Sequence, residues 1–356
     1  MSILFIGKRF YTNRDAYTER FGRVYQLPYY WSREIPTSLW LVDYHTKEKI
    51  KDKHDLLTVI STPILSIVFF ITILTTIVIK KPQKIVASGD CYIGLFAYCL
   101  AKLCKSKFIF DVYDKYDTFS GYRNLGFKNL YLFLLKKADI CLFASKKLQE
   151  DSKSICQKTT LVPNGVDTNH FYPRDRNDSR SYFNLDNDNI YIGYFGSMEI
   201  ERGIDDLIKA IEILNEENPN IYLLLGGKKR KDLDLNHSFI HYLGNVKFNI
   251  VPTAMACCNI LALPYRNSDF LDNASSCKIG EYISMGIPLI ATNSNSLIFN
   301  NYLLNFEENC LAKHSDPYDL KEKILLKLNK PQTHIQTHFN TWKEISKKAK
   351  FFLRNS

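Results

Sequence analysis

Short apolar runs alternate with helical segments along this chain, and the alternation starts again after a polar run at 174–189. Strands that alternate with helices form a parallel sheet with helices on both faces. The expected strands are 2–6, 84–87, 108–112, 140–143 and 161–162 in the first half, and 191–195, 221–225, 260–263 and 289–291 in the second. A chain of 356 residues can hold two such domains. The pattern therefore predicts an α/β protein with two Rossmann-like, doubly wound parallel-sheet domains.

Helices are expected between and after these strands. In the segment 204–214 the apolar residues recur with a period of about 3.6, which is typical of a helix with one buried face. The other helices read from the sequence are 93–105, 125–137, 146–153 and 341–353.

The net charge of +10 is concentrated in the first half of the chain. Residues 1–160 carry 25 Lys and Arg against 14 Asp and Glu, whereas residues 161–356 carry 22 against 23. This asymmetry points to an anionic partner for the first half: a nucleic acid, an acidic substrate or an anionic membrane surface. A solvated basic surface without a partner is the simpler alternative.

Residues 56–79 form a stretch of 24 residues without a charged side chain, long enough to cross a bilayer as a helix. Eight of them are Ser, Thr or Pro, and lysines flank both ends, so the charge asymmetry of a single span is absent. We therefore expect a helix partly buried in the N-terminal domain and partly facing anionic lipid head groups. An ordinary core helix and a true membrane span are the alternatives.

Nine cysteines are scattered along the chain without a C-x-x-C pair, and the apolar start at 1–7 is too short for a secretory signal. Such cysteines are typical of reduced thiols in a cytoplasmic compartment. With the basic first half, this predicts a cytoplasmic protein that associates peripherally with the inner face of the membrane.

The stretch 275–292 combines a polar loop, one short helix and a strand. Ser275 or Ser276 can cap the helix, because a serine oxygen accepts a bond from an N–H of the first turn. Lys278 and Glu281 lie three apart, so they share a helix face near its positive end. An anion is stabilised there, and a carboxylate beside it can accept hydrogen bonds from sugar hydroxyls. These residues together suggest a nucleotide-sugar site.

A second unit of this kind follows the strand at 191–195. Gly196 and Ser197 form a turn, and Arg202 and Gly203 begin the next helix, where a backbone close to a phosphate and a nearby cation are both available. The spacing differs from the G-x-G-x-x-G fingerprint, so binding of NAD is disfavoured.

Together these segments resemble the signature regions of retaining GT-B glycosyltransferases of glycosyltransferase family 4, also called glycosyl transferases group 1. The resemblance covers about 140–310 and is weak before that. It rests on four segments in the family's order, which are Leu-Val-Pro-Asn-Gly-Val-Asp at 161–167 with Phe171 and Pro173, the strand and turn at 192–203, Tyr-Leu-Gly at 242–244, and 275–292.

The resemblance implies the GT-B fold, in which two Rossmann-like domains face one another across a cleft and the last helix returns to the first domain. The expected divisions are an N-terminal acceptor-binding domain over 1–173, a linker over 174–190, a C-terminal nucleotide-sugar-binding domain over 191–334, and a returning helix within 335–356.

The resemblance also implies roles for individual residues. Arg202 occupies the position that binds the donor diphosphate, and Lys278 would share it, because Ser197 replaces a basic residue often found after the turn glycine. Glu281 matches the glutamate that binds the donor ribose. The family's preceding glutamate is Asn273 here, which can hydrogen-bond a sugar but cannot stabilise positive charge. The expected donor-binding residues are Gly196, Ser197, Arg202, Asn273, Ser275, Ser276, Lys278 and Glu281.

For two of these positions the sequence leaves alternatives open. Arg202 could be an exposed arginine at a helix start. Asp269 and Asp272 could replace the missing carboxylate, or they could be solvated loop acids.

In the first half, Asp114 follows the strand at 108–112, and the carboxyl ends of parallel strands are where open α/β sheets bind ligands. Asp114 is therefore a candidate for orienting or deprotonating the acceptor hydroxyl. An Asx turn is the alternative. Asp90, which follows Ser88 and Gly89, is a weaker candidate of the same kind. The expected catalytic residues are thus Asp114, Arg202 and Lys278.

We expect no cofactor and no required metal. Two Asp-x-Asp triplets occur, at 186–188 and 232–234, but both lie in polar segments where solvated acids are the simpler interpretation. His237 with His241 and His334 with His338 have i, i+4 spacing without the His-Glu-x-x-His form.

These observations predict a glycosyltransferase that moves a sugar from a nucleotide diphosphate donor, with retention of configuration, to a lipid-linked or lipopolysaccharide-type acceptor at the membrane. A nucleotide-sugar epimerase on the same fold is the alternative, and it would convert the donor without an acceptor. A basic nucleic-acid-binding protein is a remote alternative, because no recognisable module accompanies the charge. A catalytically inactive relative is suggested only by Asn273.

Overall fold

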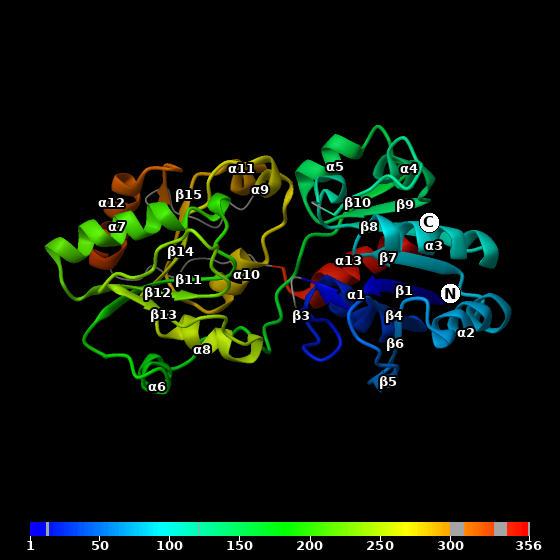
Figure 1. Cartoon of the computed structure of the whole chain (residues 1–356), viewed down its shortest axis with the longest axis horizontal. Coiled ribbons are helices and arrows are strands. Elements are labelled where there is room, and N and C mark those ends of the chain that lie inside the picture. The colour runs from blue at the N-terminus through cyan, green and yellow to red at the C-terminus, as the bar shows by residue number, and fades with distance from the viewer. Residues whose placement is uncertain (12–13, 120, 300–309, 331–339, 355–356) are drawn as a thin grey trace. The chain divides into compact units, whose positions relative to one another are not determined.

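The structure is a computed structural model that describes residues 1–11, 14–119, 121–299, 310–330 and 340–354. The chain forms two compact units (Figure 1). The N-terminal unit contains Met1–Gly165, Asn273–Ser275 and Trp342–Ser356, and the C-terminal unit contains Val166–Asp272 and Ser276–Thr341.

The polar segment expected to be a linker at 174–190 is instead part of the C-terminal unit. It contains helix α6 (Arg176–Tyr182), which Asp175 caps. Arg180 in this helix is buried and donates hydrogen bonds to the Cys257 carbonyl and the Asn259 side chain. The sequence prediction failed here because a polar run can be ordered when a buried arginine satisfies carbonyl groups of the core.

Within the described residues, the N-terminal unit is built on an eight-stranded sheet in the order β10-β9-β8-β7-β1-β4-β6-β5. Neighbouring strands are parallel except β5, which pairs antiparallel with β6. The sheet strands are β1 (Ile3–Lys8), β4 (Thr37–Asp43), β5 (Ile50–His54), β6 (Leu57–Pro63), β7 (Lys84–Ser88), β8 (Lys107–Val112), β9 (Ile140–Phe143) and β10 (Thr159–Leu161). The first two predicted strands of this half are β1 and β7, which pair in parallel.

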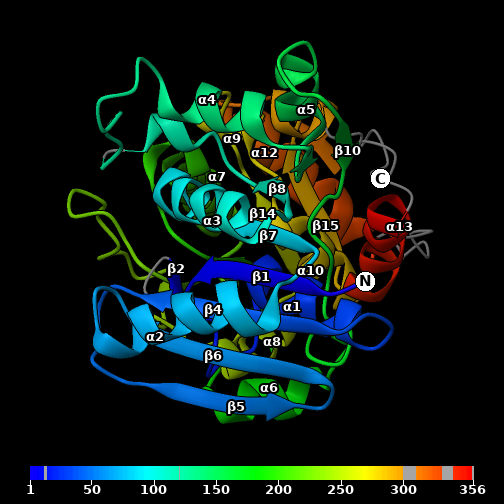
Figure 2. The same cartoon turned by 90° about the vertical axis from the view of Figure 1, so that its right-hand side faces the viewer.

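Helices cover both faces of this sheet. Figure 2 shows α2 and α3 in front of the sheet and α1 behind it. The helices of the unit are α1 (Gly22–Ser32), α2 (Ile67–Thr75), α3 (Cys91–Cys104), α4 (Leu130–Lys137), α5 (Lys146–Ser152) and α13 (Trp342–Arg354), with a π-helical turn η1 (Thr76–Lys80) directly after α2 and a short hairpin of β2 (Phe10–Tyr11) and β3 (Arg14–Asp15) after β1.

The predicted C-terminal helix is α13, and it packs in the N-terminal unit against α1. The indole N–H of Trp31 in α1 donates to the Ser346 carbonyl at 3.1 Å. Ile345 and Leu353 are buried in the core of this unit.

The apolar stretch 56–79 is not one helix, so that expectation is wrong. Its first part is strand β6, which pairs in register with β4. The run Leu-Thr-Val-Ile-Ser-Thr-Pro is rich in β-branched residues, which favour strands, and Pro63 ends it. Only the second part is helical, as α2 and η1. Among the described residues, no helix has both the length and the apolar character that crossing a membrane requires.

Within the described residues, the C-terminal unit contains a six-stranded parallel sheet in the order β13-β12-β11-β14-β15-β16. Its strands are β11 (Ile190–Phe195), β12 (Ile221–Gly226), β13 (Ile240–Tyr242), β14 (Ile260–Leu263), β15 (Leu289–Thr292) and β16 (Leu311–Ala312). Its helices besides α6 are α7 (Ile204–Glu217), α8 (Val251–Ala256), α9 (Asp269–Asn273), α10 (Cys277–Ser284), α11 (Asn295–Phe299) and α12 (Pro317–Asn329). α7 packs against α12 on one side of the sheet, and α6 packs against α8 on the other (Figure 1).

Candidate functional site

The strand order of the C-terminal sheet reverses between β11 and β14. From β11 the chain proceeds outward to β12 and β13, and it then returns to build β14, β15 and β16 on the other side. Loops leave the carboxyl ends of the two central strands in opposite directions at such a point, and open α/β sheets bind ligands in the crevice between them. This edge is therefore where the predicted donor residues are to be sought.

Gly196 follows β11 at this edge and lies under the side chain of Lys278. A Cβ atom at Gly196 would be 2.1 Å from Lys278 Cε and 2.7 Å from its Nζ, and the backbone φ of Gly196 is +149°. Only glycine allows both the backbone conformation and the position of the lysine. Lys278 Nζ is also 6.0 Å from the centre of the Tyr194 ring, beneath the same turn.

Arg202 reaches the same edge from the loop between β11 and α7, which also contains Gly196. It ends a short 3-10 turn, Ile200–Arg202, before α7. Its guanidinium carbon lies 4.9 Å from the centre of the Tyr265 ring and 5.8 Å from that of Phe270. Gly203 permits this approach, because a Cβ atom there would lie 1.8 Å from the Pro264 carbonyl oxygen.

Tyr265 links the two cationic side chains. Its ring is buried, which raises the pKa of its phenol, but the positive charges of Lys278 and Arg202, together with hydrogen bonds with Ser276 and Arg202, lower that pKa below its ordinary value. The Tyr265 hydroxyl also lies 3.3 Å from the Ser276 hydroxyl at the start of α10. The structure thus brings together three of the predicted donor residues, Arg202, Ser276 and Lys278, around a tyrosine.

The predicted serine cap of α10 is wrong. Ser276 is the N-cap residue, but among the described residues its side chain makes no capping hydrogen bond, because its hydroxyl faces Tyr265. The Ser275 hydroxyl accepts a hydrogen bond from the Asn164 backbone amide at 3.4 Å, and the Ser275 carbonyl accepts one from the Asn164 side chain at 2.9 Å. The Ser276 hydroxyl cannot face Tyr265 and cap its own helix at once. Here the contact with Tyr265 replaces the capping hydrogen bond.

The remaining predicted donor residues divide between the two units. Glu281 is half-buried on α10, one turn after Lys278, and Ser197 presents its carbonyl to the Tyr194 hydroxyl at 2.8 Å. Asn273 and Ser275 are buried and belong to the N-terminal unit. Asp272 in the same segment accepts a hydrogen bond from Asn295, so it anchors the loop.

The strand order of the N-terminal sheet reverses between β1 and β7, and Asp90 and Asp114 follow strands at its carboxyl edge. Asp114 Oδ2 accepts a hydrogen bond from the Tyr11 hydroxyl at 2.5 Å. Asp90 caps α3 by accepting from two backbone amides, and it pairs with Lys8 at 3.7 Å. Asp90 therefore has a structural role as a helix cap, whereas the role of Asp114 at the acceptor stays a prediction.

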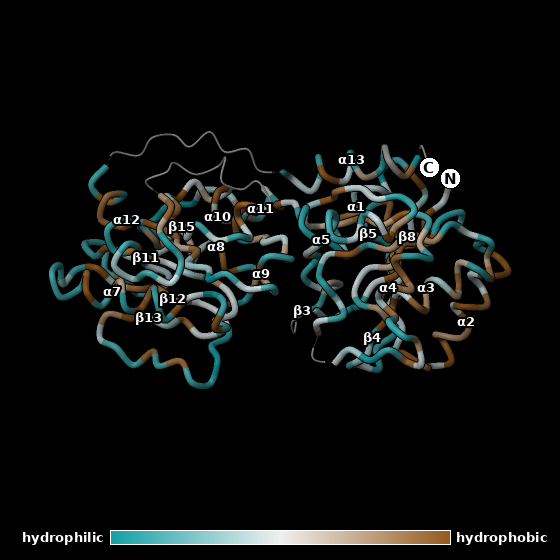
Figure 3. Tube along the Cα trace, turned by 90° about the horizontal axis from the view of Figure 1, so that it is seen from above, coloured by the Kyte–Doolittle hydropathy of each residue, from teal (hydrophilic) through white to brown (hydrophobic). Residues whose placement is uncertain are grey.

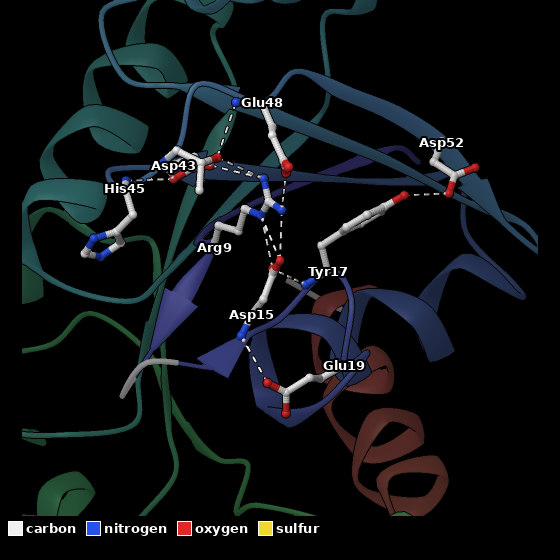
Figure 4. Close-up of polar contacts among 9 residues, drawn as sticks. Arg9, Asp15, Tyr17, Glu19, Asp43, His45, Glu48 and Asp52 are labelled. Carbon is white, nitrogen blue, oxygen red and sulfur yellow. Dashed lines mark hydrogen bonds and ion pairs between the residues drawn. The ribbon is translucent and has the colours of Figure 1, made fainter. Parts of the chain in front are cut away.

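A buried arginine organises the loops beside this edge (Figure 4). Arg9, directly after β1, forms ion pairs with Asp15 at 2.8 Å, Asp43 at 3.1 Å and Glu48 at 2.8 Å. These carboxylates come from the β2–β3 hairpin and from the end and the following loop of β4. One guanidinium therefore fixes both loops relative to the end of β1.

The Asp-x-Asp triplets take part in local contacts. Asp186 accepts from the Asp188 amide, and Asp232 pairs with Arg230 at 3.1 Å. His334 and His338 lie outside the described residues. Burial lowers the pKa of His241, which packs against the ring of Tyr222.

Comparison with known proteins agrees with this geometry. Residues 189–330, which include β11, Arg202, Tyr265 and α10, match the sequence profile of the family Glycosyl transferases group 1. The chain is 28% identical over 214 residues, 59% of its length, to an uncharacterised glycosyltransferase of Methanocaldococcus jannaschii, and that match spans 54% of the relative. It is 23% identical over 65% of its length to 68% of the capsular polysaccharide biosynthesis glycosyltransferase CapM of Staphylococcus aureus.

Solved structures extend the likeness to the whole chain. Sucrose-phosphate synthase from Thermosynechococcus elongatus aligns with 99% of this chain and 98% of its own, with a TM-score of 0.69 and 16% identity. HepE from Anabaena in complex with UDP-glucose aligns with 100% of both chains, with a TM-score of 0.69 and 14% identity. The chain thus has the α/β fold with two parallel-sheet domains that was predicted, the fold of GT-B glycosyltransferases.

Sequence reasoning missed Tyr265 and Phe270, whose rings lie against the Arg202 guanidinium. Tyr265 comes two residues after β14, at the carboxyl end of a central strand. That position was the available signal, because the carboxyl ends of strands flanking a reversal of strand order line the ligand site.

Proposed function

We propose that this protein transfers a sugar from a nucleotide diphosphate sugar to an acceptor held at a membrane, with retention of configuration at the anomeric carbon. The observation that carries the proposal is the convergence of Arg202 and Lys278 on Tyr265 at the point where the C-terminal sheet reverses its strand order. Two cations at that edge match the charge of a diphosphate.

The donor would bind with its diphosphate between these cations and the start of α10, whose dipole also favours negative charge. Cleavage of the bond to the sugar leaves a nucleoside diphosphate, so negative charge develops where Arg202 and Lys278 lie. Groups arranged in advance around a developing charge lower the barrier without needing a metal. Glu281, on the face of α10 shared with Lys278, would accept hydrogen bonds from the donor ribose.

The acceptor would bind to the N-terminal unit, with Asp114 orienting or deprotonating its hydroxyl. The Tyr11 hydroxyl bonded to Asp114 would hold the carboxylate in place. The excess of basic residues before 161 supports an acceptor at an anionic membrane surface. The name of CapM supports a role in cell-surface polysaccharide synthesis, and the UDP-glucose in the HepE complex supports a nucleotide diphosphate sugar as donor.

A thermal-shift panel of nucleoside diphosphates and nucleotide sugars tests the donor class. Ligand at about 100 times its dissociation constant stabilises a protein by roughly 2.7 kcal/mol, so the right nucleotide should give a clear rise in Tm. Glu281→Ala should lose most of that rise. Glu216→Ala, an exposed position on α7, is the matched control and should keep it. An undiminished shift in Glu281→Ala would show that Glu281 does not bind the donor, and a panel without any shift would contradict the proposal.

A further inference from the structure

The N-terminal unit carries an exposed ridge of large apolar side chains on α2 and η1. Figure 3 shows the hydrophobic colour running along α2 at the surface of the unit. Ile67 is 77% exposed and Leu74 is 61% exposed, values far above those of ordinary core residues. We call this set the α2 ridge, and its members are Leu65, Ile67, Phe70, Ile71, Leu74, Val78 and Ile79, together with Leu103 at the end of α3.

The ridge faces outward because the opposite side of the helix is anchored. Phe69 is buried, with its ring centre 5.3 Å from that of Trp40 and 5.1 Å from that of Phe96. The hydroxyls of Thr72 and Thr76 donate to carbonyls of their own helix, so these polar residues can lie against the unit. A rotation of α2 that buried the ridge would expose Phe69 to solvent. The ridge therefore stays on the surface of the unit.

Basic side chains border the far end of the ridge. Residues 56–110 contain six lysines and a single acidic residue, Asp90, which is used as the cap of α3. η1 ends at Lys80, and Lys51 on β5 lies close enough to affect the pKa of Lys80. The exposed lysines of this border are Lys51, Lys80, Lys81, Lys102 and Lys105.

We propose that the α2 ridge inserts into the interface of an anionic bilayer while the bordering lysines bind lipid phosphates. This inference deepens the proposed function, because it names the surface that would bring the enzyme to a membrane-held acceptor. Apolar side chains inserted at the head-group boundary gain from burial, and lysines on neighbouring elements gain from the lipid phosphates, so the two contributions add at an anionic bilayer. Protein interfaces instead favour aromatic residues, Met and Arg and are depleted in Lys, whereas Phe70 is the one member of the ridge and its border of a favoured type, and five members are lysines.

The position of the ridge fits this role. It starts directly after β6, where the Ile64 amide donates to the Asp43 carbonyl at 2.9 Å. Asp43 is also bound by Arg9 at the carboxyl edge of the N-terminal sheet, the edge that carries Asp114. The start of the ridge therefore lies at the same edge of the N-terminal sheet as Asp114, where the acceptor would bind.

Co-sedimentation of the full chain with vesicles tests the inference. The chain should bind vesicles of phosphatidylcholine and phosphatidylglycerol far more strongly than vesicles of phosphatidylcholine alone. The double substitution F70S/L74S should weaken binding to the anionic vesicles by more than about tenfold, because it removes two large side chains from the inserted area. L326S/Y318S replaces two exposed apolar side chains on α12 and should leave vesicle binding unchanged.

The charge contribution has its own pair of variants. K80S/K81S should weaken binding to anionic vesicles, whereas K153S/K158S removes the same charge elsewhere on the unit and should have a much smaller effect. Vesicle binding that is equal for both lipid compositions, or that F70S/L74S leaves unchanged, overturns the inference. A protein that forms dimers dispersed by F70S/L74S, and binds no vesicles, overturns it as well. The nucleotide panel needs no vesicles, so failure of the donor assignment is detected separately.

Discussion

The side chain of Lys278 occupies the space that a side chain on Gly196 would need. The two residues lie on α10 and after β11, and they meet because β11 and the loop before α10 both end at the point where the sheet reverses its strand order. The contact places an ammonium group over a backbone turn whose φ is +149°. A substitution at Gly196 therefore tests whether Lys278 binds the donor diphosphate.

Gly196→Ala should weaken binding of the best nucleotide in the panel by more than about tenfold, because the added methyl displaces Lys278 from the turn. Titration calorimetry measures the affinity. Gly244→Ala is the control: its φ is +69°, but nothing lies within 4 Å of the added Cβ, so it incurs only backbone strain of roughly 1–2 kcal/mol. Equal affinity in both variants would show that the position of Lys278 does not matter for binding.

Arg202→Gln should lower nucleotide diphosphate affinity by roughly tenfold to a hundredfold, the range expected for losing hydrogen bonds to a charged group. A nucleoside without phosphates should bind both proteins equally, because it never contacts Arg202. Arg176→Gln makes the same charge change on α6 and should bind like the unmodified chain. If Arg202→Gln lost affinity equally for the nucleoside, the residue would act through the fold and not through the diphosphate.

The pH dependence of donor binding should report on Tyr265. Against the effect of burial, Lys278 and Arg202, with the hydrogen bond of Ser276, lower the pKa of this phenol below its ordinary value of 10. The phenolate is negative and competes with the diphosphate for the same two cations, so affinity should fall as the pH rises through that pKa. Tyr265→Phe should flatten the decline in the alkaline range, whereas Tyr318→Phe on α12 should not. A decline of the same size in Tyr265→Phe would place its origin elsewhere.

Removing one partner of the buried ion pair of Arg23 and Asp111 should strongly destabilise the N-terminal unit. Arg23 Nη2 lies 2.6 Å from Asp111 Oδ1, the Ser88 hydroxyl donates to the same carboxylate, and Arg23 also donates to the Val162 carbonyl. Asp111→Asn leaves a buried guanidinium without its counter-charge and should cost roughly 3–5 kcal/mol in urea unfolding. Lys147→Ser breaks an exposed helix pair with Asp151 and should cost no more than about 0.5 kcal/mol. If both variants lost a similar free energy of unfolding, the buried ion pair would contribute no more to stability than an exposed one.

Much of the fold could be predicted because its signals are local. The strands at 140–143 and 260–263 are short apolar runs with clear ends, and the structure has them at the same bounds. For the stretch 56–79 the prediction of a single helix was wrong, because continuous hydrophobicity does not distinguish a buried strand from a helix. Its β-branched first part became β6 once β4 and β5 were available on either side.

The candidate site divides in the same way. Gly196, Arg202 and Lys278 could be selected from the sequence, because glycine turns and helix starts have recognisable residue patterns. The serine cap could not be judged, since Ser276 chooses between its own helix and Tyr265, which lies eleven residues earlier. Tyr265 carries no motif beyond its place just after a strand, and its contact with Arg202 depends on the strand order of the sheet.

By itself, the sequence determined the alternation of strands and helices, the location of the flexible glycines and the uneven charge, because each depends on residues close together in the chain. The tertiary structure alone decided that Arg202 and Lys278 share one tyrosine, that Arg9 binds three carboxylates, and that the α2 ridge faces outward. These contacts depend on the order in which the strands assemble, and no local pattern specifies which strand becomes whose neighbour.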